Sequence, residues 1–222
     1  MYGGDLRRTP TPLDPAFQHL MLVEGMEDGR LYEMACKFAG VSDKIEIRSV
    51  GGKTEFTNAL RLLVSLGQHL RTIAIIRDAD DDPRAAFQSA CDAMKNARLP
   101  IPAKPGELSL EHEGRSTAVL VVPPNGPGCI ESLCWSSLSK HPVATCVEEF
   151  IGCARTKDPP SNPSSLAAID KSRIHVVLAI GMNASSVARV GLRVGEASWD
   201  WSHEAFEPVI RFVKAVARDG DS

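Results

Sequence analysis

The 222-residue sequence lacks the excess of basic residues that lets a protein hold nucleic acid by charge alone. It carries 25 lysine and arginine residues against 28 aspartate and glutamate residues, which gives a formal net charge of −3. Because phosphate backbones are bound mainly by cationic groups, any contact with nucleic acid must use a local patch or a metal ion. This composition weakens a nucleic-acid function without excluding it.

The sequence also lacks the patterns of zinc-binding, secreted and membrane-spanning proteins. None of its six cysteines forms a C-x-x-C pair, and its six histidines do not fall at zinc-finger spacing. No apolar segment near the N-terminus has the character of a signal peptide, and no apolar run is long enough to span a membrane. We therefore expect a cytoplasmic protein without membrane association, whose reduced cysteines act as small core residues.

Hydrophobic residues make up 43% of the chain and charged residues 24%, a balance typical of a globular domain. The length suffices for one sizeable core. We expect residues 1–16 to form a flexible arm and residues 17–222 a single domain, with a core at 17–125 and a helical part at 126–222.

Strand-like and helix-like segments alternate through the first half of the chain. Apolar or alternating runs predict strands, and apolar residues at helical spacing predict helices capped by Asp28 and Thr54. The expected strands lie at 17–24, 44–50 and 71–77, and the expected helices at 28–39, 54–69 and 83–97. This order predicts an α/β fold, a mostly parallel sheet flanked by helices, with its functional edge at the carboxyl ends of the strands.

The second half of the chain is predicted to be mainly helical. Segments 108–111 and 117–122 have the pattern of a hairpin. Helices are then expected near 129–139, 142–155, 163–181 and 203–217. Trp199 and Trp201 precede the last helix, and we expect them to seal the core beneath it rather than stack on bases.

Four aspartates crowd the end of the third expected strand, at positions 78, 80, 81 and 82. Like charges this close raise one another's pKa values and cost stability. A divalent cation such as Mg²⁺ or Mn²⁺ replaces this repulsion with shared attraction, and it prefers carboxylate oxygens. We expect Asp78 and Asp80, two positions apart, to point over the same sheet edge as ligands. Asp82, just before Pro83, is either a further ligand or the cap of the next helix.

A second group of acids follows the first expected strand. Glu24 ends the strand, Gly25 permits a tight turn, and Asp28 comes four residues after Glu24. In a doubly wound sheet the first and third strands can be neighbours, so Glu24 is expected to face the same site as Asp78 and Asp80. The sequence therefore predicts a metal site made by acids from separate strands.

These residues resemble the Toprim domain, a metal-binding fold shared by topoisomerases, bacterial primases, recombination proteins and certain nucleases. The matching features are Glu24-Gly25 after one strand and Asp78-Ala79-Asp80 after a later one, and the resemblance covers about residues 17–125. The spacing from Glu24 to Asp28 is most similar to nucleases of the OLD (overcoming lysogenization defect) type and to stand-alone bacterial Toprim proteins.

The resemblance implies Mg²⁺- or Mn²⁺-dependent hydrolysis of phosphodiester bonds in DNA or RNA. Glu24, Asp78 and Asp80 would be catalytic as well as metal-binding. Some similar proteins are encoded beside an ATPase, which implies a possible partner ATPase. Either this partner ATPase or a homodimer could complete a basic substrate channel.

Residues beyond the aspartates complete the expected site. Glu131 follows the glycine-rich turn after the last strand and resembles a later acidic ligand, although it could equally be an exposed helix acid. Lys171 resembles the late lysine of the OLD type, expected to neutralise transition-state charge. Lys53, in SVGGKT, lacks phosphate-loop spacing but follows a strand, so we expect it to contact a phosphate. Arg173 is a further substrate-binding candidate, and His175 is expected to pack.

Other functions are alternatives to that of a nuclease. A topoisomerase is disfavoured because Tyr2 lies in the expected arm and Tyr32 lies in the first helix, and a primase because its zinc module is absent. A phosphatase of the haloacid dehalogenase type is disfavoured because its D-x-D normally ends the first strand. A glycosyltransferase could use D-x-D to hold manganese and a diphosphate, but this leaves Glu24-Gly25 unexplained. A Toprim module that binds nucleic acid or a partner without cutting remains open.

Overall fold

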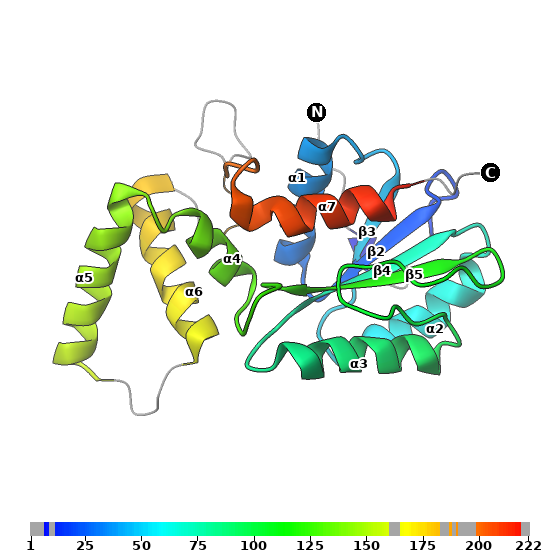
Figure 1. Cartoon of the computed structure of the whole chain (residues 1–222), viewed down its shortest axis with the longest axis horizontal. Coiled ribbons are helices and arrows are strands. Elements are labelled where there is room, and N and C mark those ends of the chain that lie inside the picture. Colours follow the sequence, from blue (N-terminus) through cyan, green and yellow to red (C-terminus); the bar gives the residue numbers. More distant parts are fainter. Residues whose placement is uncertain are drawn as a thin grey trace.

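The structure is a computed structural model that describes residues 7–8, 12–159, 165–182, 187, 190 and 199–218. Its described part contains a five-stranded sheet in the order β1-β3-β2-β4-β5, and every neighbouring pair is parallel. Helices cover both faces (Figure 1), which confirms the predicted α/β class. The strands are β1 (Arg7–Arg8), β2 (His19–Val23), β3 (Ile45–Ser49), β4 (Thr72–Asp78) and β5 (Ser116–Val122).

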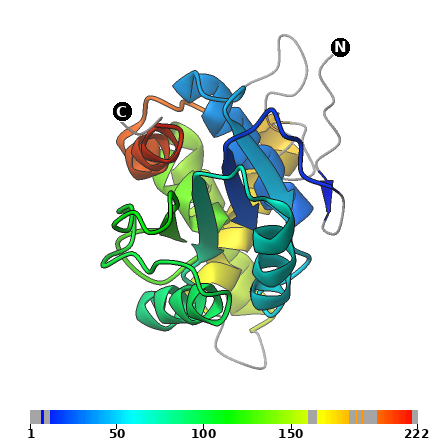
Figure 2. The same cartoon turned by 90° about the vertical axis from the view of Figure 1, so that its right-hand side faces the viewer.

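Two apolar layers hold the helices against the sheet. Helix α1 (Met26–Ala39) packs on one face together with the last helix, α7 (Glu207–Val216). Helices α2 (Phe56–Leu66) and α3 (Pro83–Asn96) pack on the other face. Figure 2 shows the two helix layers with the strands between them. The central strand β2 is buried along its whole length, as expected for a parallel strand covered on both sides.

The strand order brings the two acidic segments together. β2 pairs with β4 in a register that places Leu22 opposite Ile75. The residues that follow both strands therefore emerge side by side at the edge where β2, β3, β4 and β5 end, here termed the carboxyl edge. This confirms the prediction that the first and third long strands are neighbours.

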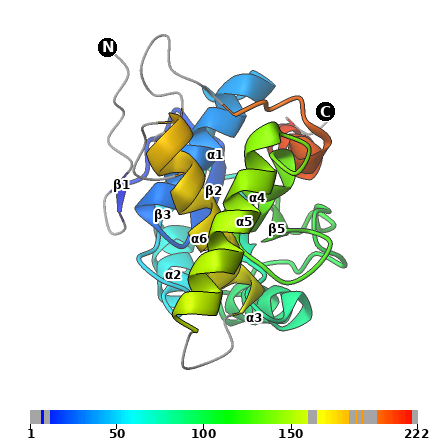
Figure 3. The same ribbon diagram turned by 90° about the vertical axis from the view of Figure 1, so that its left-hand side faces the viewer.

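Three of the helices that follow β5, from here on termed the helical part, lie beyond the carboxyl edge (Figures 1 and 3), whereas α7 packs on the sheet. These three are α4 (Ile130–Ser137), α5 (Pro142–Lys157) and α6 (Leu166–Val177), and α6 continues into a π-helical turn, Leu178–Met182. The predicted helix 163–181 begins outside the described residues. α6 packs on α4 and α5, and Ile130 at the start of α4 donates its backbone N–H to Asp78 at the end of β4.

The aromatic residues before the last helix pack as predicted. Trp199 is buried, and its Nε1–H donates to the Val187 carbonyl at 3.0 Å. The rings of Trp199 and Trp201 lie 6.2 and 4.8 Å from the ring of Phe206. Phe206 ends the 3₁₀ turn Glu204–Phe206 that leads into α7. These contacts seal the core beneath the helix.

Several helix starts differ from the prediction, and those of α1 and α2 change a predicted cap. α1 begins two residues earlier than expected, because Gly25 takes the N-cap position and Asp28 is the third helical residue. α2 begins at Phe56 after Glu55, so Thr54 is not its cap. The predicted hairpin is reduced to isolated antiparallel bridges such as Leu108↔Ala118, and β5 pairs along its length with β4 instead.

The N-terminal arm contacts β3 where the structure describes it. β1 pairs with β3, the Asp14 N–H donates to the Glu46 carboxylate at 3.2 Å, and Arg48 donates to the Pro12 carbonyl. The remaining residues of the arm, 1–6 and 9–11, lie outside the described part.

Three side chains expected in the core are exposed. Cys146 and Cys153 lie on α5, which contacts α6 but leaves much of its own surface open, so they differ from the four buried cysteines. His175 on α6 is also exposed, whereas its neighbour Ile174 is buried. The six cysteines are all free thiols.

Candidate functional site

Asp78 ends β4 and lies at the centre of the carboxyl edge. Its Oδ1 accepts the backbone N–H of Ile130 at 3.1 Å, which ties the first turn of α4 to β4. Burial, followed by the negative charges of Asp28, Glu24 and Glu131, raises the pKa of Asp78 to about 8. At neutral pH, and with no metal ion bound beside it, this carboxyl group retains a proton.

Glu24 follows β2 and pairs with an arginine from the neighbouring strand. Arg77 Nε lies 3.2 Å from Glu24 Oε1, and Arg77 Nη1 donates to Ser89 Oγ at 2.9 Å. The Arg77 guanidinium also lies 5.7 Å from the centre of the Phe56 ring. Burial raises the pKa of Glu24, and Arg77 only partly offsets this. Arg77 therefore holds Glu24 in place from the α2 and α3 side of the sheet.

Asp28 is turned back towards the strand that precedes its helix. Its Oδ2 accepts the Gly25 N–H at 2.8 Å, the reciprocal contact of a capping box. A Cβ at Gly25 would lie only 3.1 Å from this oxygen, so the close turn favours glycine. Burial raises the pKa of Asp28, the Gly25 hydrogen bond lowers it, and the charge of Glu131 raises it further. Asp28 thus lies within electrostatic reach of α4.

Glu131 and Lys171 complete this group from the helical part. Glu131 lies in the first turn of α4, and its buried Oε2 has no hydrogen-bond partner among the residues that the structure describes. Burial pulls the pKa of Lys171 on α6 down, but attraction to Glu131, Asp78 and Asp28 outweighs it and raises the pKa. Lys171 is therefore the positive charge that faces these acids. We call Glu24, Asp28, Asp78 and Glu131 the acid cluster.

Asp80 lies beside the acid cluster in more open surroundings. Its backbone has a positive φ of 50°, and its carbonyl accepts the Gly128 N–H at 2.7 Å. Its carboxylate pairs with Lys53 at 3.1 Å, and the two side chains are 49% and 59% exposed. Asp78 is held against α4 instead. The two aspartates therefore have different partners.

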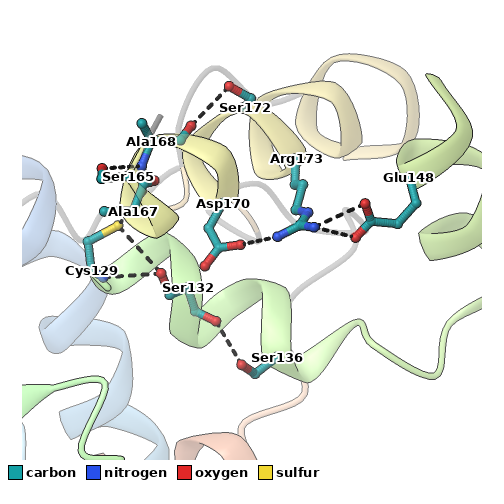
Figure 4. A network of polar contacts seen from close by, with 10 residues as sticks. All are labelled: Cys129, Ser132, Ser136, Glu148, Ser165, Ala167, Ala168, Asp170, Ser172 and Arg173. Atoms are coloured by element: carbon teal, nitrogen blue, oxygen red, sulfur yellow. Dashed lines mark hydrogen bonds and ion pairs between the residues drawn. The ribbon is translucent and has the colours of Figure 1, made fainter. Parts of the chain in front are cut away.

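Asp82 and Arg173 are engaged in structural contacts. Asp82 caps α3, where its Oδ1 accepts the N–H groups of Arg84 and Ala85 at 2.9 and 3.0 Å. Figure 4 shows Arg173 on α6 between Asp170 and Glu148, at 2.7 and 2.8 Å.

The Arg173 contacts join the three helices of the helical part. Asp170 is buried on α6, Glu148 comes from α5, and the Arg173 guanidinium lies 5.5 Å from the centre of the Trp135 ring on α4. The Cys129 thiol, just before α4, also reaches the Ala167 carbonyl of α6 at 3.9 Å. These contacts set the position of α6, and with it Lys171, relative to Glu131.

The chemistry of the acid cluster fits a hard divalent cation. Carboxylate oxygens are the preferred ligands of such ions, and the buried Glu131 Oε2 is an acceptor that the described part of the chain leaves unsatisfied. Within the described ranges, however, no three histidine, cysteine or acidic side chains already form a ready coordination shell. Binding of a cation therefore requires carboxylates to rotate or to give up their present partners.

Sequence reasoning missed Arg77 and the Asp170–Arg173–Glu148 contacts. The signal for Arg77 was a charged residue directly after the apolar run Ile73–Ile76, inside a buried strand. Asp170 and Arg173 are three residues apart on one helix, a spacing that favours ion pairs. Nothing local in the sequence indicated Glu148 as the third member.

No helix among the described residues is long and apolar enough to cross a membrane.

Three solved structures of the C-terminal region of the Xanthomonas campestris pv. campestris OLD protein match this chain. The one phased with mercury shares 15% identity at a TM-score of 0.46, covering 89% of this chain and 95% of that chain. The one phased with iodine shares 17% at 0.42, with the same coverage.

A search of curated proteins finds no match. The model of the family described as "Protein of unknown function (DUF3226)" matches residues 18–218. Because this match spans most of the chain, the protein belongs to the DUF3226 family.

Proposed function

We propose that this protein is a Toprim-type phosphodiesterase that uses Mg²⁺ or Mn²⁺ to hydrolyse phosphodiester bonds in DNA or RNA. The observation that carries the proposal is that four carboxylates from three segments lie within electrostatic reach of one another at one sheet edge, with Lys171 facing them. Crowded, partly buried carboxylates cost folding free energy. A function that brings positive charge to this edge accounts for their being together.

The residues that would hold the cation are those of the acid cluster together with Asp80. A bound divalent cation supplies an activated water and stabilises charge on the transferred phosphoryl group. Glu24 and Asp80 would exchange Arg77 and Lys53 for this ion, whereas Glu131 Oε2 has no partner within the described ranges to give up. The Asp82 side chain is already bound to the start of α3, so we place it outside this set.

The protein's own groups supply the remaining chemistry. Asp78 Oδ1 accepts the Ile130 N–H, which favours Oδ2 as the site of the proton that the raised pKa retains. Loss of that proton would make the Asp78 carboxylate able to hold a divalent cation. Lys171 is kept protonated by the acids around it, and it can balance negative charge that develops on the phosphate. Arg77 keeps Glu24 oriented at the edge.

The test is cleavage of supercoiled plasmid DNA and of a labelled RNA by the purified full chain, with Mg²⁺ or Mn²⁺. We expect activity that EDTA abolishes and that Asp78→Asn and Glu24→Gln reduce about 100-fold or more. Asp43→Asn is the matched control, because Asp43 is an exposed acid next to the amino end of β3, at the opposite edge. Equal cleavage by all three variants would refute the assignment of the site.

A second candidate is a Toprim module that binds metal and nucleic acid, or a partner, without cleavage. It is favoured by the ion pairs that occupy Glu24 and Asp80, and by the net charge of −3. Metal-dependent binding of DNA without nicking would support it. A partner ATPase and a homodimer stay predictions of the sequence resemblance, and co-purification tests them.

A further inference from the structure

We propose that Gly51, Gly52 and Lys53, here termed the glycine turn, bind a backbone phosphate of the nucleic acid. In the metal-free protein Lys53 is held by Asp80, and it exchanges this carboxylate for the phosphate when a divalent cation binds at the carboxyl edge. This inference rests on the proposed function, and it names the part of the site that holds the substrate.

The glycine turn is fixed beside the acid cluster by backbone contacts. The Gly51 N–H donates to the Glu24 carbonyl at 2.9 Å, and Ser49 Oγ donates to the same carbonyl at 3.2 Å. The Glu55 N–H closes the turn on the Gly52 carbonyl at 3.1 Å. The turn that carries Lys53 is therefore attached to the residue that contributes the first acid of the cluster.

The backbone of the glycine turn is open to close approach by a ligand. Gly51 and Gly52 have φ values of 90° and 140°, which side-chain-bearing residues rarely adopt. A Cβ built at either position would meet no atom of the described residues within 4 Å. The positive φ values account for glycine at both positions, and the open space beside them leaves the main chain accessible to a phosphate.

The ion pair between Lys53 and Asp80 is suited to exchange. The atoms lie 3.1 Å apart, but both side chains are about half exposed. Exposed pairs of this kind contribute little stability, and lysine carries its charge on a flexible stem. A cation that takes Asp80 as a ligand would release Lys53 within reach of the same edge. Lys53 thus competes with the metal ion for the Asp80 carboxylate, and it strengthens binding of the substrate phosphate.

This arrangement predicts effects of opposite sign when the charge of Lys53 is removed. In Lys53→Met we expect Mg²⁺ and Ca²⁺ affinity, measured by calorimetry, to rise about 2- to 5-fold, because a competing cation is lost. We expect affinity for a fluorescein-labelled DNA duplex in Ca²⁺ to fall. The slope of log K against log salt should lose about 0.9 in magnitude, the contribution of one phosphate contact.

Two further variants make the test specific. Lys53→Arg should keep the salt slope of the wild type, because the charge remains. Lys95→Met removes an exposed lysine in the last turn of α3, near the amino edge of the sheet, and should change neither affinity.

The outcomes separate this inference from the proposed function. An unchanged salt slope in Lys53→Met, or unchanged metal affinity, would overturn the exchange even if the wild type cleaves DNA. If the opposite-signed effects appear but no preparation cleaves DNA or RNA, the glycine turn stands as a phosphate site and hydrolysis fails.

Discussion

Replacing Asp78 with asparagine should stabilise the metal-free protein, although it removes a central residue of the candidate site. Asparagine has nearly the same shape, and its Oδ1 can still accept the Ile130 N–H. What the substitution removes is a carboxyl group whose pKa is raised from 3.8 to about 8, by burial first and by neighbouring acids second. In the unfolded chain, neither burial nor the neighbouring acids raise the pKa of this group.

The expected magnitude follows from linkage between proton binding and folding. For pH values between these two pKa values the folded protein holds a proton that the unfolded chain has lost, so stability falls as pH rises through this window. Each pH unit contributes about 1.4 kcal/mol, which amounts to about 4 kcal/mol at pH 7. This figure is a ceiling, because neighbouring carboxylates share the proton. At pH 5 the difference should shrink to about 2 kcal/mol.

Thermal denaturation in EDTA at a series of pH values measures this difference. For a chain of this size, about 4 kcal/mol corresponds to a Tm about 8–16 °C higher for Asp78→Asn at pH 7. Asp43→Asn, which alters an exposed acid at the opposite edge, should differ little from the wild type at any pH. Added Mg²⁺ should raise the Tm of the wild type by mass action and narrow the gap to Asp78→Asn. A metal-free Asp78→Asn protein less stable than the wild type at pH 7, or a difference that does not vary with pH, would refute the reasoning.

Two further predictions concern residues that support the site. Asp82→Ala should lower the free energy of unfolding by about 1 kcal/mol through loss of the α3 cap, while Mg²⁺ affinity in calorimetry stays unchanged; weaker Mg²⁺ binding would make Asp82 a ligand. Arg173→Gln should reduce DNA cleavage in the wild type but not in a Lys171→Ala background, because Arg173 acts by setting the position of Lys171; equal losses in both backgrounds would assign Arg173 an independent role.

Much of the fold could be predicted from local patterns. Buried parallel strands are continuous apolar runs, and Leu20, Leu22, Ile73 and Ile75 belong to such runs in neighbouring strands. The helix start at Pro83 follows from the fixed φ of proline and from the capping side chain of Asp82. Adjacency of the two acidic segments then follows from strand order, and the structure confirms this.

What could not be predicted depends on contacts between distant segments. Gly25 displaces Asp28 from the N-cap position, because the Asp28 side chain reaches back to the Gly25 N–H. The different surroundings of Asp78 and Asp80 arise from α4 and from the glycine turn, each far away in sequence. Arg77 acquires its role only where β2 and β4 lie side by side.

The exposure of α5 could not be predicted from the sequence for a similar reason. Its sequence contains Cys146, Phe150 and Cys153, which a local pattern assigns to a core. In the structure α5 packs on α6, and these side chains lie on its exposed surface. Burial of a helix face depends on how many partners it has, and that number is not encoded within the helix.

The most direct test of the metal assignment is anomalous diffraction from a crystal soaked with Mn²⁺. We predict one or two anomalous peaks at the carboxyl edge, each coordinated by oxygens of the acid cluster or Asp80, with Lys53 turned away from Asp80. An edge without a peak at saturating Mn²⁺, with Glu24 still on Arg77 and Asp80 still on Lys53, would contradict the account.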